Sequence, residues 1–253
     1  MSSKADYNQF KKAMDTIASE IPNNKTALAY SGGVDSTAIL LSLVDANAKF
    51  SVIHMRYDDA KNSYGIFLER MVSHICRKFK TPALILPKDF EHFYELIADS
   101  GVKNLVDGEG MDRMYLELHY EDGSPRQLSF GEPFRAYFPL VEMLFFYAPN
   151  RFASYGVPKS FHPGDKEDLE AKEIEKKLDI KIIKYSYHPE MLKFFKGYKE
   201  DVADIFFRKR FTEMYVKDKL GMSFNSLVRE VYRLNHSRFK SFGKRFFELN
   251  ARA

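Results

Sequence analysis

Hydrophobic and polar positions follow two different periods in the first part of the chain. Short apolar runs indicate buried strands, and they alternate with longer segments whose apolar residues recur every three to four positions, as in amphipathic helices. The predicted helices are residues 5–21, 35–46, 63–79 and 90–98, and the predicted strands are residues 26–30, 50–55, 83–86 and 103–106. This alternation is typical of an α/β fold with a doubly wound parallel sheet.

The rest of the chain is less regular and then becomes helical. We expect a strand or hairpin near residues 127–138, a helix at 140–147, a charged helix at 164–178 and one more strand at 180–187. From residue 189 onward the apolar residues recur at helical spacing, with helices at 224–234 and 239–249. We therefore expect an α/β domain over residues 1–190 and a helical C-terminal lobe over residues 191–253.

Composition and charge narrow the class of protein. The net charge is +4, but residues 191–253 hold 15 Lys and Arg against 7 Asp and Glu, so the C-terminal lobe is the basic part. This lobe is either a helical unit with a solvated basic face or a surface that meets nucleotide or nucleic-acid phosphates. The single cysteine, Cys76, excludes a disulfide framework and favours a reducing, cytoplasmic setting. The N-terminus lacks the apolar core of a signal peptide and no long apolar run is present, so we expect no membrane association.

The segment Ser31–Thr37 (SGGVDST) interrupts an apolar strand and leads into an apolar helix. Two glycines at a strand-to-helix junction let backbone N–H groups turn toward an anion, and the helix N-terminus adds its positive end. The spacing fits neither a Walker loop nor a dinucleotide fingerprint. Asp35 would repel phosphate unless a cation lay between them, so we interpret it as a Mg²⁺ ligand; the alternative is a helix-capping turn without a ligand.

A second strand, glycine turn and helix follow at Asn104–Tyr115 (NLVDGEGMDRMY). Gly108 and Gly110 permit a tight turn at the edge of the sheet. Glu109 and Asp112 are three residues apart, so near a helix start they can share one face. One carboxylate can hold Mg²⁺ and pyrophosphate while the other acts as a base, or both can be first-turn acids that stabilise the helix.

The hexapeptide Ser31–Ser36 resembles the signature loop of the PP-loop ATP pyrophosphatases, which include GMP synthetase, NAD synthetase, asparagine synthetase, tRNA-lysidine synthetase and 7-cyano-7-deazaguanine synthase. The resemblance implies ATP and Mg²⁺, with the loop on the β,γ-pyrophosphate and adenine at the end of the second strand. A substrate oxygen would attack the α-phosphorus, pyrophosphate would leave, and a nucleophile would take the adenylated intermediate. The implied ATP-binding residues are Ser31, Gly32, Gly33, Asp35, Ser36, Thr37, His54, Met55 and Gly108.

The second segment resembles the SGEGADE motif of asparagine synthetase and β-lactam synthetase. The resemblance implies that Asp112 helps to bind Mg²⁺–pyrophosphate and that Glu109 is an acid or base. Arg113 departs from the usual Glu, which leaves the substrate's identity open. Asparagine synthetase has a cysteine directly after the initiator Met, whereas this chain has Ser2, so we expect free ammonia or an amine as nucleophile. Among Lys159, Lys196, Lys199, Arg208 and Arg210, we select Lys199 as the catalytic cation that neutralises pyrophosphate.

Three functions follow from these features. The first is an AMP-forming ligase, asparagine-synthetase-like, that adenylates a small-molecule carboxylate or amide oxygen before ammonia or an amine attacks. The second is ATP-dependent modification of a nucleic-acid base, docked through the basic C-terminal lobe. The third is a nucleotide-binding regulatory protein without catalysis. The sequence leaves the oligomeric state open, a homo-oligomer included.

Overall fold

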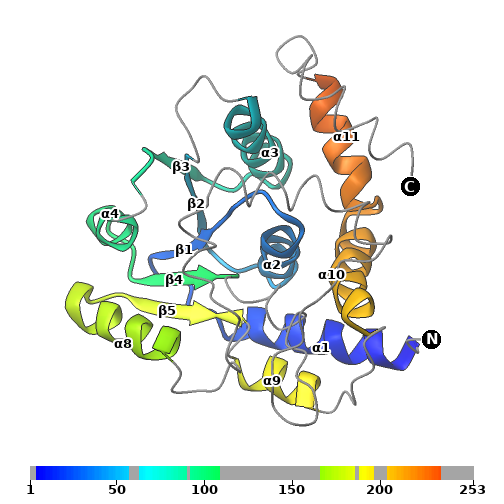
Figure 1. Cartoon of the computed structure of the whole chain (residues 1–253), viewed down its shortest axis with the longest axis horizontal. Helices are drawn as coiled ribbons and strands as arrows, with labels where there is room; N and C mark the ends of the chain where they lie inside the picture. The colour runs from blue at the N-terminus through cyan, green and yellow to red at the C-terminus, as the bar shows by residue number, and fades with distance from the viewer. Residues whose placement is uncertain are drawn as a thin grey trace.

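The computed structural model describes residues 4–56, 63–89, 92–108, 166–185, 188–196 and 204–234. Strands and helices alternate through most of this part of the chain, as Figure 1 shows. The strands are β1 (Thr26–Ala29), β2 (Ser51–Met55), β3 (Ala83–Leu86), β4 (Asn104–Asp107) and β5 (Lys181–Lys184). The helices are α1 (Lys4–Glu20), α2 (Val34–Asp45), α3 (Ser63–Phe79), α4 (Phe93–Asp99), α8 (Lys166–Leu178), α9 (Pro189–Lys196), α10 (Asp204–Leu220) and α11 (Phe224–Leu234).

The five strands form one sheet in the order β3-β2-β1-β4-β5, and every neighbouring pair is parallel. The chain moves outward from β1 through β2 to β3, and then returns to the other side of β1 for β4 and β5. The strand order therefore reverses between β1 and β4, which is where open α/β sheets bind ligands at the carboxyl ends of their strands. The doubly wound parallel α/β fold predicted from the sequence is confirmed.

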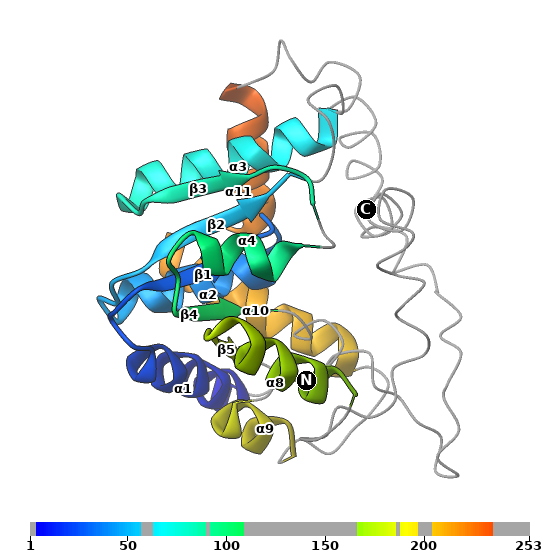
Figure 2. The same cartoon turned by 90° about the vertical axis from the view of Figure 1, so that its left-hand side faces the viewer.

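Helices cover both faces of the sheet. In Figure 1, α4 and α8 lie on one side and α1, α2 and α3 on the other, and Figure 2 brings α4 and α8 to the front. An apolar core lies on each face of the sheet, and alternate residues of a strand pack into one core or the other, because successive side chains point to opposite faces. Val52 of β2 packs in the larger core with α2 and α3, while Ile53 and Met55 pack in the smaller core with Ile97 of α4.

Helices α10 and α11 extend the larger core. Phe211 and Tyr215 of α10 are fully buried, and Phe211 stacks on Phe10 of α1 with ring centroids 5.9 Å apart. Leu227 and Val231 of α11 belong to the same apolar cluster. Helices on both sides of the expected boundary at residue 190 thus share one core; whether they are separate domains stays a prediction.

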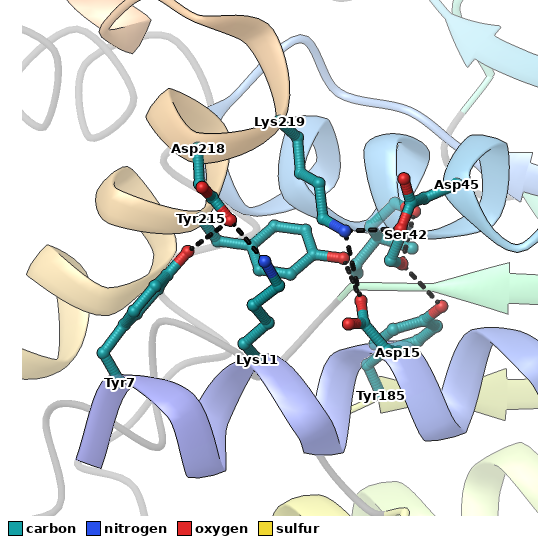
Figure 3. Close-up of polar contacts among 10 residues, drawn as sticks. Tyr7, Lys11, Asp15, Ser42, Asp45, Tyr185, Tyr215, Asp218 and Lys219 are labelled. Carbon is teal, nitrogen blue, oxygen red and sulfur yellow. Dashed lines mark hydrogen bonds and ion pairs between the residues drawn. The ribbon is translucent and has the colours of Figure 1, made fainter. Parts of the chain in front are cut away.

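Polar contacts also tie α10 to α1 and α2 (Figure 3). The Tyr215 hydroxyl donates to Oδ1 of Asp15 at 2.7 Å, and the Lys219 ammonium lies 2.5 Å from Oδ2 of Asp45 at the end of α2. Because Lys219 is largely buried and its ammonium lies at the C-terminal end of α2, its charge opposes the negative end of that helix as well as the carboxylate. These contacts fix the direction in which α10 crosses the α/β core.

Most predicted elements agree with the structure to within one or two residues. Two elements differ more. The helix predicted from residue 90 begins at Phe93, after the Asp89 carboxylate accepts a hydrogen bond from the His92 amide at 3.1 Å. The strand predicted at 180–187 ends at Lys184, because the chain leaves the sheet at Tyr185. The elements predicted at 127–138, 140–147 and 239–249 lie outside the described residues. In the part of the chain that the structure describes, no helix has the length and apolar character needed to cross a membrane.

Candidate functional site

The Ser31–Thr37 loop leaves β1 at the carboxyl edge of the sheet, beside the point where the strand order reverses. Gly108 follows β4, the neighbour of β1 on the other side of that point. The two glycine turns noted in the sequence, separated by 75 residues of chain, are therefore adjacent at one edge. This is the position at which open α/β folds hold phosphate-bearing ligands.

Gly32 has the backbone conformation that glycine alone adopts readily, with φ of +86°. A Cβ atom added there would also lie 3.1 Å from Cδ2 of Leu68, on α3. The left-handed backbone at position 32 and the nearby side chain of α3 both favour glycine over any residue with a Cβ atom.

Gly33 is the N-cap of α2 and, as a glycine, has no side chain with which to cap the helix. The first N–H groups of a helix have no acceptor within the helix, and a capping side chain usually satisfies one of them. Here the first intrahelical bond runs from the Thr37 amide to the Gly33 carbonyl at 3.0 Å. The amides of residues 34–36 therefore come before the first closed turn, at the positive end of the helix, as required for binding an anion.

Three hydroxyl side chains fix the shape of this loop. The hydroxyls of Ser36 and Thr37 donate to the Gly33 carbonyl at 3.1 and 2.7 Å, so the proton of Ser31 Oγ goes to Ser36 Oγ at 3.0 Å. The buried Tyr30 hydroxyl lies 2.9 Å from Thr37 Oγ1 and donates to it. Burial raises the pKa of Tyr30, so the phenol keeps its proton for this bond.

These contacts refine what the predicted donors do. Ser31 is exposed, and Ser36 is 5% exposed, whereas Thr37 is fully buried and occupied with Gly33 and Tyr30. In this arrangement Thr37 holds the loop, and contact between its hydroxyl and a phosphate stays a prediction. Tyr30 was not predicted as a site residue; its place at the end of a strand directly before the glycines was the signal that could have indicated it.

Asp35 lies in the first turn of α2, where the helix dipole favours a carboxylate. Its Oδ1 atom is buried, next in the chain to the Ser36 hydroxyl. A carboxylate and a hydroxyl supply hard oxygen atoms, which fit Mg²⁺. Among the described residues no three His, Cys, Asp or Glu side chains gather into a metal site, so Mg²⁺ here would need phosphate oxygens or water as further ligands.

His54 and Met55, at the carboxyl end of β2, are buried on opposite faces of the sheet. His54 Nδ1 lies 2.8 Å from the Tyr30 carbonyl oxygen, so Nδ1 carries the proton and donates it. Nε2 is buried and has no hydrogen-bond partner within the described ranges. Burial lowers the pKa of His54, which keeps the imidazole neutral; its described role is to fix the Tyr30 peptide at the base of the loop.

Gly108 lies so close to α2 that a Cβ atom there would be 2.8 Å from Cδ1 of Ile39. Before it, Asp107 ends β4 and is 9% exposed, opposite Lys184 at the end of β5. Lys184 was missed by the sequence prediction, because its place at this edge follows only from the register. It joins the candidates for a cation near pyrophosphate.

The remaining predicted residues are placed only in part. Glu109, Asp112, Lys159 and Lys199 lie outside the described residues. Lys196 ends α9, and Arg208 and Arg210 belong to α10. Their roles stay predictions.

Cys76 lies in the apolar core on α3, and burial raises the pKa of its thiol to about 11. A thiol in this state is a poor nucleophile, since the thiolate is the reactive form.

No protein-family model matches the chain, and no curated protein matches it. Among solved structures, one similar fold is the U34-tRNA thiolase NcsA from Methanococcus maripaludis, solved with its [4Fe-4S] cluster. It is 13% identical, with 89% of this chain and 78% of that chain covered and a TM-score of 0.37. A likeness this distant supports no conclusion about activity or ligand, so the function proposed below rests on this chain's own residues.

Proposed function

We propose that this chain is an ATP-dependent enzyme of the PP-loop type, which transfers AMP to an oxygen atom of its substrate and releases pyrophosphate. The observation that carries the proposal is the start of α2. Its N-cap is a glycine, which has no side chain for capping, at the carboxyl edge of a parallel sheet and beside the reversal of strand order. The loop sequence, SGGVDS, matches the signature of that superfamily in full.

Transfer of AMP from ATP requires the enzyme to bind the β- and γ-phosphates, which leave as pyrophosphate. A substrate oxygen attacks the α-phosphorus of ATP, and the bond from that phosphorus to the oxygen bridging to the β-phosphorus breaks. Pyrophosphate leaves with that bond's electron pair, and AMP stays on the substrate oxygen. A nucleophile then attacks the activated carbon and AMP departs. Amides of residues 34–36, at the positive end of α2, would hold the pyrophosphate as its charge grows.

Asp35 would hold Mg²⁺ together with pyrophosphate oxygens. Bound Mg²⁺ would supply positive charge against the leaving pyrophosphate. In our proposal Asp112 is a second metal ligand, Glu109 is the acid or base and Lys199 neutralises pyrophosphate. Thr37, Tyr30 and His54 act through the loop, because each bonds to its backbone or to one another.

For the acceptor we favour a nucleic-acid base. The supporting observation is the excess of Lys and Arg over Asp and Glu in residues 191–253, 15 against 7. Within the described part of this segment, Lys217, Arg229 and Arg233 are exposed. The asparagine-synthetase-like ligase is the other acceptor class, and it depends on the segment Gly108–Asp112, of which the structure describes only Gly108.

Sulfur transfer through a cysteine of this chain does not fit. Iron–sulfur clusters are held by several cysteine thiolates, and this chain has one cysteine, which is buried in the core. The cluster named for the M. maripaludis thiolase therefore has no ligand set here. A nitrogen nucleophile, ammonia or an amine, is the choice consistent with the residues present.

The test measures whether α-³²P-ATP is converted to labelled AMP or to labelled ADP in the presence of Mg²⁺. The protein is incubated with total RNA, or with a pool of small carboxylates and amines, each with ammonium, and AMP is separated from ADP. Asp35→Asn is compared with Asp45→Asn, which changes the same residue type at the far end of the same helix.

We expect AMP and pyrophosphate with RNA, loss of the signal after ribonuclease treatment, a large loss in Asp35→Asn and little change in Asp45→Asn. AMP formation with the small-molecule pool alone would identify the ligase class in place of base modification. ADP and phosphate as products, or ATP binding without turnover in either pool, would contradict the proposal.

A further inference from the structure

Each strand of the sheet has a lysine at its first residue or within three residues before it. Lys80, Lys49, Lys25 and Lys103 come just before β3, β2, β1 and β4, which is also their order across the sheet, and Lys181 is the first residue of β5. We call these five residues the lysine row. It lies at the amino edge of the sheet, at the opposite end of α2 from the Ser31–Thr37 loop.

The strand register places two of these lysines side by side. Thr26 pairs with Asn104, so Lys25 and Lys103 are neighbours. Lys49 and Lys80 lie in the segments that lead into β2 and β3, and these two strands pair with each other.

Backbone hydrogen bonds link three members of the row. The Lys103 amide donates to the Lys25 carbonyl at 2.9 Å, and the Lys181 amide donates to the Lys103 carbonyl at 2.7 Å. At ~4.8 Å between neighbouring strands, the row is about 19 Å long.

The row is exposed and mostly without neutralising partners in the described part of the chain. All five side chains are exposed, and only Lys103 makes an ion pair among the described residues, with Asp179 at 2.5 Å. The last turn of α3 adds two exposed cations beside the row, Arg77 and Lys78. The acidic residues that end the nearby helices are Glu20, Asp45, which Lys219 already binds, and Asp99. Positive charge therefore predominates along this edge.

Helix ends account for part of this charge but not for its arrangement. Helices α1, α2, α3, α4 and α8 each precede a strand of the parallel sheet, so their negative C-terminal ends lie at this edge. A lysine near such an end stabilises the fold by about 0.3–1 kcal/mol. That effect does not require a lysine before or at the start of every strand along one edge of the sheet, where like charges repel one another. Repulsion along a line is relieved when an anionic polymer lies on it.

We propose that the lysine row binds the phosphate backbone of a nucleic acid. Several exposed cations along one edge match a polymer that carries an anion at every repeat, and lysine binds phosphate as a point charge without reading sequence. A row of about 19 Å is long enough to contact several phosphates of one strand. The exposed amides of Asn23, Asn24 and Asn47 lie in the loops between these lysines and the preceding helices and can donate further hydrogen bonds.

The sequence alone did not indicate this surface, because successive members are 23 to 78 residues apart along the chain. It is also separate from the basic C-terminal lobe that the sequence suggested for nucleic acid. The proposed binding rests on charge and register alone and does not depend on the proposed ATP chemistry. Helix α2, whose 12 residues span about 18 Å, separates the row from the ATP loop.

The test measures binding of a fluorescein-labelled, mixed-sequence, 20-nucleotide RNA by anisotropy over a range of NaCl concentrations. The row variant carries Lys25→Gln, Lys49→Gln and Lys80→Gln, which leaves the Lys103–Asp179 pair intact. The matched control carries Lys12→Gln, Lys172→Gln and Lys176→Gln, three exposed lysines on α1 and α8, outside the basic C-terminal segment, with the same total change of charge. Thermal unfolding of both variants checks that they fold.

We expect the row variant to bind RNA about tenfold or more weakly, and the slope of log K against log salt to fall by about 2, or ~0.7 for each phosphate that is no longer neutralised. The control should change far less, and ATP affinity should be unchanged in both. Equal weakening in the two variants, or no RNA binding by the unaltered protein, would overturn the proposal. So would binding of phosphatidylserine vesicles, or of a polyglutamate peptide, without RNA. If the protein binds RNA through the lysine row but does not turn over ATP, the proposed function is contradicted and the proposed RNA-binding surface is not.

Discussion

Replacing Gly32 with Ala tests whether the phosphate loop is shaped as the structure describes. The substitution places a side chain at φ of +86°, which costs about 1–2 kcal/mol for an L-residue. It also brings the new Cβ to 3.1 Å from Cδ2 of Leu68, and crowding in a packed region adds about 1 kcal/mol, the low end of the usual range. We therefore expect the free energy of unfolding to fall by about 2–3 kcal/mol.

Gly101→Ala is the matched control, because Gly101 has φ of +83° and no described atom within 4 Å of an added Cβ. It should lose only the conformational part, about 1–2 kcal/mol. Urea unfolding measures both variants. Calorimetric titration with Mg²⁺–ATP should show at least about tenfold weaker binding for Gly32→Ala, since a displaced loop loses charge-assisted hydrogen bonds, and unchanged binding for Gly101→Ala.

A double-mutant cycle isolates the contact with α3. Leu68→Ala removes the crowding atom, so Gly32→Ala should cost about 1 kcal/mol less in that background than in the unaltered protein. Equal losses of stability and of ATP affinity for Gly32→Ala and Gly101→Ala, or a coupling energy of zero, would refute the reasoning.

Three further predictions concern the packing and the buried polar groups. Gly108→Ala should destabilise by about 1–3 kcal/mol because its Cβ meets Cδ1 of Ile39, and Ile39→Val, which lacks that atom, should remove most of the loss in a urea-unfolding cycle. Tyr215→Phe removes a hydrogen bond to the Asp15 carboxylate (Figure 3) and should cost about 1.5–3 kcal/mol in the same assay; a smaller effect than that of an exposed Tyr→Phe change would contradict it. Burial lowers the pKa of His54 below its ordinary 6.5, so below pH 6.5 the unfolded chain binds a proton more readily than the folded chain does. The free energy of unfolding is therefore full above about pH 6.5 and falls as the pH drops. His54→Gln should reduce that fall between pH 7.5 and 5.5.

The sequence predicted the layers of the fold because periodicity is a local property. Apolar runs and helical spacing located β1 to β4 and α1, α3 and α11 closely, and the glycine-rich loop gave a prediction of where a ligand binds. The loop's internal bonding was not predictable in the same way. Thr37 was expected to face phosphate, yet its hydroxyl donates to the Gly33 carbonyl and accepts from Tyr30, a choice set by packing under the loop.

Contacts between distant segments were harder to predict than local structure. Strand order and register bring Lys184 to the carboxyl edge of the sheet, and strand order gathers Lys25, Lys49, Lys80 and Lys103 at the amino edge. Neither placement leaves a pattern along the chain, because each lysine is unremarkable among its own sequence neighbours. Charge counted over a segment drew attention to residues 191–253, whereas the lysine row comes from loops spread over the whole sheet.

The most direct test of the proposed ATP site is to locate pyrophosphate on the protein. Backbone amide resonances of the ¹⁵N-labelled chain are recorded while Mg²⁺–pyrophosphate is added, with Asp35→Asn as the comparison. We expect the largest shifts to fall on residues 32–36, at the start of α2, and to be abolished or much reduced in the variant. Saturable binding whose shifts lie elsewhere, or no shift in residues 32–36 at concentrations that saturate ATP binding, would contradict the proposed site.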